Sequence, residues 1–133
     1  MPVSSGSVEI LMTDGHKAME QTDWAEAKVC FEAALQIKEL PEALELLGLA
    51  AWWLDDASTA FDAREKAYRL YRERGDSRSA ARVAIALAYD YLSFRGEYVI
   101  SNGWSRRAHR LLEGLELTPE HGWIKAWDGI RCH

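Results

Sequence analysis

The chain has 133 residues, 48% of them hydrophobic and 28% charged, so it is long enough to bury a core as one domain. Residues 1–7 are small and polar, and no apolar stretch reaches the roughly 18 residues of a membrane span, so we expect a flexible start, no leader, no membrane partner and a cytoplasmic location. Cys30 and Cys132 lack the spacing of a disulfide framework or a metal site, which predicts two free thiols.

The net charge of −5 is unevenly distributed along the chain. Residues 1–62 hold three Lys/Arg against twelve Asp/Glu, a net charge of −9, whereas residues 63–133 hold thirteen against nine, a net charge of +4. Solvated helix faces commonly produce such an imbalance. The same imbalance permits head-to-tail association or a composite surface for a partner.

Apolar residues recur at helical spacing along nearly the whole chain, which predicts seven helices. The first spans about residues 8–21. Asp23 opens the second as an N-cap, with Glu26 three residues later completing a capping box. Pro41 suits the first position of the third helix, because its missing N–H has no helical partner there.

The remaining helices are also delimited by cap and turn residues. Asp55 and Asp56 open a fourth helix that stops at Gly75, and Asp76 caps a fifth that ends before Gly96. A sixth helix is expected over about residues 97–113, with Val99 and Ile100 in its apolar pattern. Thr118 and Pro119 open a seventh, over residues 119–132.

An internal repeat relates the first two pairs of helices, with one constant offset between its copies. The aligned residues are Gly15, Ala18, Trp24, Ala27, Phe31 and Ala34 in the first copy, and Gly48, Ala51, Ala57, Ala60, Arg64 and Ala67 in the second. Glycine inside a helix costs about 1 kcal/mol relative to alanine, so two glycines in one register indicate close approach of a neighbouring helix. Periods of about 33 residues are typical of stacked helix-turn-helix repeats.

A third copy is less regular, because its offset from the second is longer and Tyr89 replaces the glycine. Tyr98, Ser101, Ser105 and Ala108 stand where Ala57, Ala60, Arg64 and Ala67 stand in the second copy. Three pairs are about the minimum for a stable array.

This pattern resembles the tetratricopeptide repeat over about residues 8–114. The resemblance implies an all-α, right-handed superhelical array of antiparallel helix pairs, at about residues 8–40, 41–75 and 76–114, with a terminal helix 119–132 in the same single domain 8–133. It departs from the family at Arg64, where an aromatic is usual. The fold implies a non-catalytic module that binds through its surface.

A narrower similarity concerns three segments, residues 57–68, 72–76 and 108–114, which resemble the helical-repeat region of large bacterial LuxR-type transcriptional regulators. In those proteins the region senses or relays a signal beside nucleotide-binding and DNA-binding parts, neither of which this chain contains. The resemblance implies a fragment or a stand-alone relative with a sensory or regulatory role in transcription.

In tetratricopeptide arrays the first helix of each pair lines a concave groove, so its outward positions are the candidate partner-binding residues. By register these are Glu9, Met12, His16, Met19, Glu20, Glu42, Glu45, Leu49, Trp52, Trp53, Val83, Ala86, Asp90 and Ser93. The groove would be acidic and apolar, which suits a peptide or protein with basic and large apolar residues. An acidic tail, as bound by carboxylate-clamp members of the family, would be repelled.

The sequence shows no catalytic, cofactor or metal motif. His16, His109, His121 and His133 are scattered, without ligand spacing, and no P-loop, GxSxG or dinucleotide fingerprint occurs. Basic residues between Arg64 and Arg110 are interleaved with acidic ones, which favours ion pairs within helices over direct nucleic-acid binding. We therefore expect neither an enzyme nor a cofactor.

Two alternative functions remain open at this stage. Trp52, Trp53, Met12 and Met19 could line a pocket for a small apolar effector, or the tryptophans could simply pack against the next helix pair. Trp123, Ile124 and Trp127 on the last helix could instead support self-association as a homodimer.

Overall fold

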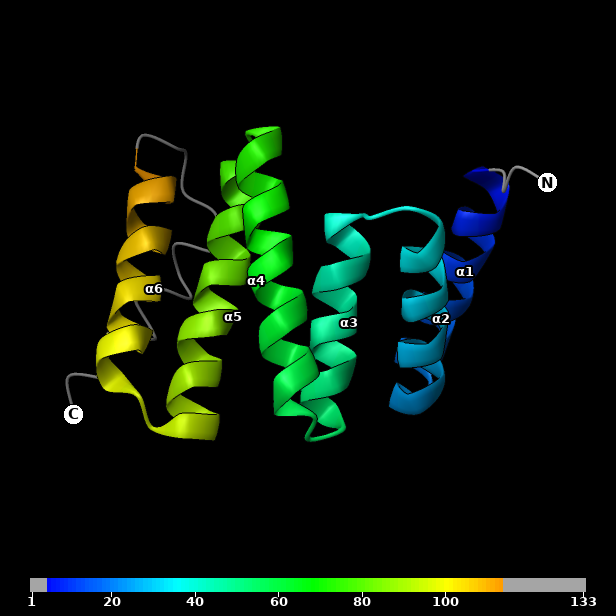
Figure 1. Cartoon of the computed structure of the whole chain (residues 1–133), viewed down its shortest axis with the longest axis horizontal. Helices are drawn as coiled ribbons and strands as arrows, with labels where there is room; N and C mark the ends of the chain where they lie inside the picture. Colours follow the sequence, from blue (N-terminus) through cyan, green and yellow to red (C-terminus); the bar gives the residue numbers. More distant parts are fainter. Residues whose placement is uncertain (1–4, 114–133) are drawn as a thin grey trace. The chain divides into compact units, whose positions relative to one another are not determined.

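The computed structural model describes residues 5–113, and there it consists of six α-helices without a β-strand (Figure 1). The predicted all-α class is therefore confirmed. The helices are α1 (Ser5–Glu20), α2 (Trp24–Ile37), α3 (Pro41–Trp53), α4 (Ala57–Arg74), α5 (Ser77–Arg95) and α6 (Tyr98–Leu112). Across this range, none of the helices combines the length and the apolar character that crossing a membrane requires.

The helices form two compact units, residues 1–67 and 68–133, and the boundary lies within α4. In the first unit α1 packs on α2 and α2 packs on α3; in the second, α5 packs on α6 (Figure 1). α1 begins at Ser5, three residues ahead of the predicted start. The predicted seventh helix at 119–132, with Trp123, Ile124 and Trp127, lies outside the described residues.

One turn geometry connects α1 to α2, α3 to α4 and α4 to α5. In each turn a residue with positive φ precedes an aspartate: Thr22 (φ 57°) before Asp23, Asp55 (φ 59°) before Asp56, and Gly75 (φ 79°) before Asp76. The aspartate N–H then donates to the carbonyl five residues earlier, over 2.8, 2.9 and 3.0 Å. Thr22 and Asp55 are related by the offset that relates Gly15 to Gly48, so the repeat extends to backbone conformation.

The same three aspartates cap the helices that follow, as predicted. Oδ1 of Asp23, Asp56 and Asp76 accepts the backbone N–H three residues later, over 3.2, 3.2 and 3.1 Å. The reciprocal half of the predicted capping box at α2 is wrong, because the N–H of Asp23 donates to the Ala18 carbonyl. The Glu26 carboxylate instead accepts a hydrogen bond from Cys30 Sγ over 3.6 Å.

Gly15 and Gly48 lie where the neighbouring helix leaves no room for a side chain. A Cβ on Gly15 would stand 2.5 Å from Cε1 of Phe31, and a Cβ on Gly48 would stand 2.7 Å from Cγ of Arg64. The predicted close approach is therefore confirmed in both copies. In the third copy Tyr89 occupies the corresponding position, and its side chain is exposed.

Burial follows the predicted repeat register through all three helix pairs. Ala27, Ala60 and Ser101 are completely buried, and so are the three equivalent alanines at the second small position, Ala34, Ala67 and Ala108. In the second unit the Ser101 hydroxyl donates to the Ala88 carbonyl over 2.7 Å, which satisfies a polar group that the other copies lack. Small residues thus sit at the same places although the offset of the third copy is longer.

The apolar pattern predicted for α6 is partly wrong. Val99 is 84% exposed and Ile100 is also exposed, while the buried stripe of α6 is Ser101, Ser105, Ala108 and Leu112. The stripe keeps helical spacing, and its small residues allow α6 to pack closely on the alanine-rich α5. Val99 and Ile100 lie off that stripe and are exposed, although they are hydrophobic.

Candidate functional site

The predicted binding residues on α1 divide into exposed polar and half-buried apolar side chains. Glu9 and His16 are exposed, whereas Met12 and Met19 are half-buried. The imidazole of His16 also meets the ring of Phe31 edge to face, with centroids 6.1 Å apart. This helix therefore presents an accessible polar surface with methionine at its margin.

The predicted residues on α3 combine carboxylates with large apolar groups. Glu42, Glu45 and Trp52 are half-buried, while Leu49 and Trp53 are exposed. They lie on one 13-residue helix that is otherwise strongly apolar, with seven buried residues. The accessible side chains of α3 are therefore of the mixed acidic and apolar kind that was predicted.

The second unit does not supply the predicted residues in the same way. Asp90 is completely buried and Val83 is 1% exposed, so neither side chain is available to a partner. The prediction of Asp90 as a surface residue is wrong, because α5 is buried over a wider arc than its sequence indicates. Ser93 is exposed and Ala86 is half-buried, as a surface position would be.

Three tryptophans of the first unit form a continuous aromatic cluster, called here the tryptophan cluster: Trp24 on α2, and Trp52 and Trp53 on α3. The rings of Trp24 and Trp53 stack with centroids 5.2 Å apart and planes 8° from parallel. Trp52 and Trp53 meet edge to face at 4.9 Å and 87°. Trp53 is nevertheless 53% exposed. Trp53 is therefore both a packing residue and a surface residue.

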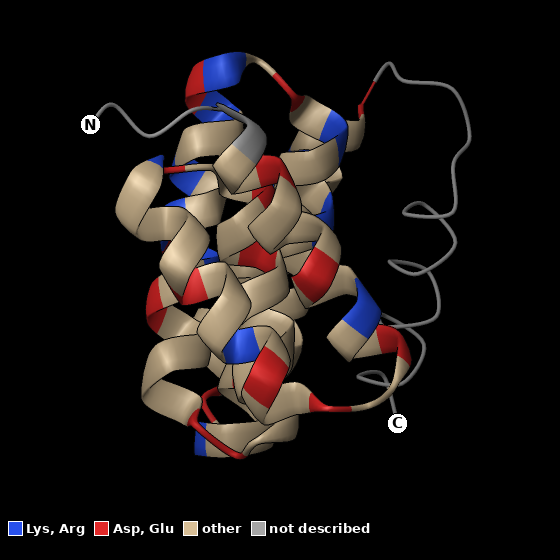
Figure 2. Cartoon of the chain, turned by 90° about the vertical axis from the view of Figure 1, so that its right-hand side faces the viewer, with Lys and Arg blue, Asp and Glu red and all other residues tan. Residues whose placement is uncertain are grey.

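The first unit, which contains the tryptophan cluster, carries a net negative charge. Residues 1–67 carry thirteen Asp/Glu against five Lys/Arg, and Figure 2, which views the chain from the side of α1, shows acidic segments spread over several helices. One of the cations, Lys28, pairs with Asp56 over 3.3 Å. Hydrogen bonds from Thr59, followed by the ammonium of Lys28, hold the pKa of Asp56 below its ordinary range, so this carboxylate stays charged.

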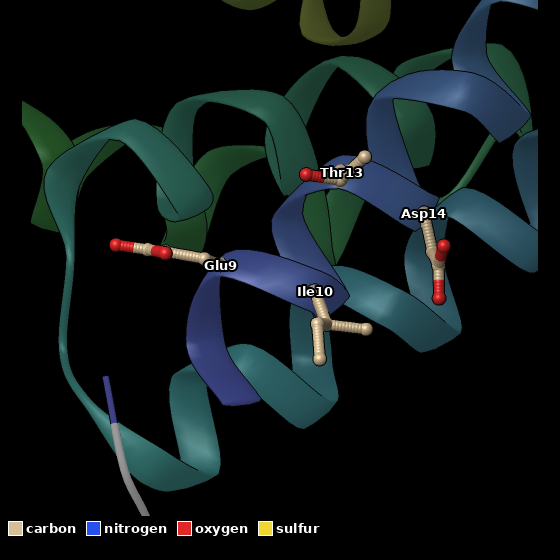
Figure 3. Close-up of a pocket in the computed structure, with 4 residues that line it drawn as sticks. All are labelled: Glu9, Ile10, Thr13 and Asp14. Carbon is tan, nitrogen blue, oxygen red and sulfur yellow. The ribbon is translucent and has the colours of Figure 1, made fainter. Parts of the chain in front are cut away.

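A depression of about 530 Å³ adjoins α1, and the described residues that line it are Glu9, Ile10, Thr13 and Asp14. Figure 3 shows these four side chains leaving the helix in different directions, with Glu9 pointing away from Asp14. Binding sites bring a few polar groups together on one ligand, and these groups do not converge. We assign no ligand to this depression.

A second hollow of about 560 Å³, called here the α2–α4 groove, was not predicted. It is bordered by α2, the first turns of α3 and the first half of α4. Its lining residues are Glu32, Leu35, Gln36, Glu39, Leu44, Leu47, Ser58, Thr59, Asp62, Ala63 and Lys66. The polar residues Glu32, Gln36 and Glu39 recur at helical spacing in the sequence, but nothing there showed that α4 lies opposite. None of Trp52, Trp53, Met12 and Met19 lines either hollow, so the predicted pocket for an apolar effector gains no support from them.

Groups with reactive chemistry are dispersed in the described residues. No set of three or more His, Cys, Asp or Glu side chains in residues 5–113 could hold a metal ion, and His16 and His109 are exposed on different helices. Cys30 is a free, buried thiol. Burial, followed by the charge and hydrogen bond of Glu26, raises the pKa of the Cys30 thiol, which makes it a poor nucleophile.

No family model matches the chain, and no curated protein matches it. The candidate function therefore rests on the geometry of the described residues.

Proposed function

We propose that this chain is a non-catalytic interaction module of the tetratricopeptide type, which binds a peptide or protein segment through α1 and α3. The observation that carries the proposal is the tryptophan cluster, in which Trp53 stays half exposed despite two aromatic contacts. Exposed indoles that are already held rigid lose little conformational freedom when a partner packs on them. Tryptophan is accordingly enriched among residues that dominate binding energy.

The partner segment in this proposal carries basic and large apolar residues. The excess of carboxylates in residues 1–67 attracts cations, and the half-exposed ring of Trp53 can receive a Lys or Arg side chain on its face. Exposed Leu49 provides an apolar contact on the same helix. Like-charge repulsion disfavours an acidic tail at Glu9, Glu42 and Glu45.

The tetratricopeptide assignment is supported by the repeated contacts of Gly15 and Gly48 and by the shared burial of the small positions. Part of the proposal is a cytoplasmic, sensory role in a transcriptional regulator of the LuxR type, which rests on the sequence similarity of residues 57–68, 72–76 and 108–114. In such a regulator, the module binds a protein segment and passes this binding signal to the rest of the protein.

The test is a selection of random peptides displayed on phage against the full chain, followed by fluorescence anisotropy with the enriched peptides. We expect basic and apolar residues to be enriched. Trp53→Ser and Glu45→Lys should each weaken binding, Trp53→Ser by about tenfold or more. Val99→Ser is the matched control, because Val99 is an exposed apolar residue in the second unit.

Equal effects of Trp53→Ser and Val99→Ser would contradict the proposal, as would enrichment of acidic peptides. Circular dichroism melting curves of the variants separate loss of binding from loss of folding.

A further inference from the structure

The α2–α4 groove is a second candidate site on the first unit, made from none of the predicted partner-binding residues. Its volume of about 560 Å³ falls in the range of roughly 300–1,000 Å³ that is usual for ligand sites. Leu44 and Leu47 are nearly buried and form an apolar floor, whereas Glu32, Glu39 and Asp62 are exposed along the rim. An apolar floor with a charged rim is the general construction of a helix-binding groove.

The charges of the rim are unequal on its two sides. On α4, Lys66 Nζ pairs with Asp62 Oδ2 over 3.2 Å, so these two charges offset one another. On the α2 side, Glu32 and Glu39 are both acidic, and Lys66 is the one Lys or Arg among the described residues that line the groove. The groove therefore presents a net negative charge along its α2 side.

The α2 side of the groove indicates which groups an occupant carries. Glu32, Leu35 and Gln36 stand at positions i, i+3 and i+4 and form one stripe on α2, and Glu39 follows directly after the C-cap residue Lys38. Because Glu39 lies beyond the extended C-cap of α2, helical rise sets only the spacing of Glu32, Leu35 and Gln36. A partner helix with aliphatic residues at i+3 and i+4 between basic residues at i and i+7 places its charges about 10 Å apart, and flexible lysine side chains let these charges approach both carboxylates.

We propose that the α2–α4 groove binds an amphipathic helix of a partner protein, in which two basic residues seven positions apart flank a pair of aliphatic residues. The aliphatic pair packs over Leu35, Leu44 and Leu47, and the basic residues meet Glu32 and Glu39. This site does not depend on the tryptophan cluster, so each site can fail its own test without affecting the other.

The test uses a fluorescein-labelled synthetic peptide of two tandem copies of KAALLAAK, titrated with the full chain at low salt and followed by fluorescence anisotropy. We expect saturable binding that weakens about tenfold or more when both leucine pairs become serine, or when every lysine becomes glutamate. The double variant Glu32→Lys with Glu39→Lys should weaken binding of the lysine peptide by about tenfold. The same variant should bind the glutamate peptide better than the wild-type chain does.

Two controls keep the outcome specific. Glu73→Lys with Glu113→Lys makes the same change in net charge at exposed positions of the second unit and should alter binding less than about twofold. Trp53→Ser should weaken binding of this peptide less than the groove pair does, because the peptide is built to match Glu32, Glu39 and the leucines of the groove. The proposal is overturned if the peptide does not bind, if the control pair weakens it as much as the groove pair, or if the charge-swapped combination fails to recover.

Discussion

Arg64 occupies, against Gly48, the place that Phe31 occupies against Gly15. The aliphatic part of Arg64 lies where a Cβ on Gly48 would meet its Cγ at 2.7 Å, and the residue is only 7% exposed. An arginine therefore does the packing that an aromatic ring does in the first copy, because its methylene stem can be buried. The substitution that weakened the sequence repeat preserves the contact between the helices.

This pair of contacts predicts different outcomes for two identical substitutions. Gly15→Ala should destabilise the chain by about 1–2 kcal/mol, because overpacking against the rigid ring of Phe31 exceeds the gain of about 1 kcal/mol in helix propensity. Gly48→Ala should cost less, since the stem of Arg64 can change rotamer. Urea unfolding followed by circular dichroism measures both.

Gly103→Ala is the control for that comparison, because Gly103 lies inside α6 with nothing within 4 Å of the place that an added Cβ would occupy. It should stabilise the chain by about 1 kcal/mol, the full difference in helix propensity. A destabilisation by Gly103→Ala equal to that of Gly15→Ala would refute the close-packing explanation.

The shared turn predicts that Thr22→Gly stabilises the chain, by about 1 kcal/mol. Thr22 has φ 57°, a conformation that a β-branched residue adopts at a cost and that glycine adopts freely. Gly75→Ala, at φ 79°, should destabilise by a similar amount. Thermal unfolding of the two variants provides the measurement, and Gln21→Gly, one residue before the turn position, controls for general loosening of the chain.

The lowered pKa of Asp56 predicts that part of the free energy of unfolding is lost in acid. Its pKa is lower in the folded chain than its ordinary value, so it stabilises the fold above the ordinary carboxyl pKa, and this contribution is lost as the pH falls through the folded value. Asp56→Ala should cost about 1 kcal/mol at neutral pH, because the cap of α4 is lost. Urea unfolding from neutral to acid pH tests both effects.

Asp56→Asn separates the two roles of this side chain, because asparagine caps a helix about as well as aspartate but carries no charge. Most of the neutral-pH stability should remain while the acid-dependent part disappears. An unchanged pH profile in Asp56→Asn would show that the charge of Asp56, and its pairing with Lys28, contributes nothing.

Cys30 predicts slow thiol chemistry in the folded chain. Its burial, followed by the neighbouring Glu26, raises its pKa, so little thiolate is present at neutral pH. In a Cys132→Ser background, Ellman's reagent should modify Cys30 far more slowly in buffer than in urea. Glu26→Gln should speed the reaction in buffer, and equal rates in buffer and in urea would contradict the burial of this thiol.

Local signals in the sequence predicted the helices well. Asp23, Asp56 and Asp76 cap helices, Pro41 begins one and Gly96 ends one, because each of these roles depends on backbone groups within a few residues. The glycines of the repeat were also interpreted correctly, since only a close neighbour explains a glycine at the same place in two helices. These features accounted for the order and approximate bounds of the six described helices.

The candidate site was predicted less completely. The exposed positions of α1 and α3 agree with the periodicity, but Asp90 is buried and Val99 is exposed, against the polarity of each residue. The stacking of Trp24 on Trp53 was also missed, because their separation in the sequence is too large for a pattern of helical period to relate them. Glu32, Gln36 and Glu39 recur at helical spacing in the sequence, but the sequence did not show that α4 lies opposite them.

By itself, the sequence determined where helices begin and end and which small residues allow close packing, because these properties arise from interactions along one helix or its adjoining turn. Only the tertiary structure decided which face of each helix is buried, how Trp53 is held, and that α2 and α4 border a common groove around Leu44 and Leu47. Those outcomes depend on helices that meet although they are far apart in the sequence, and the side chains on the opposing helix are as important there as the residue itself.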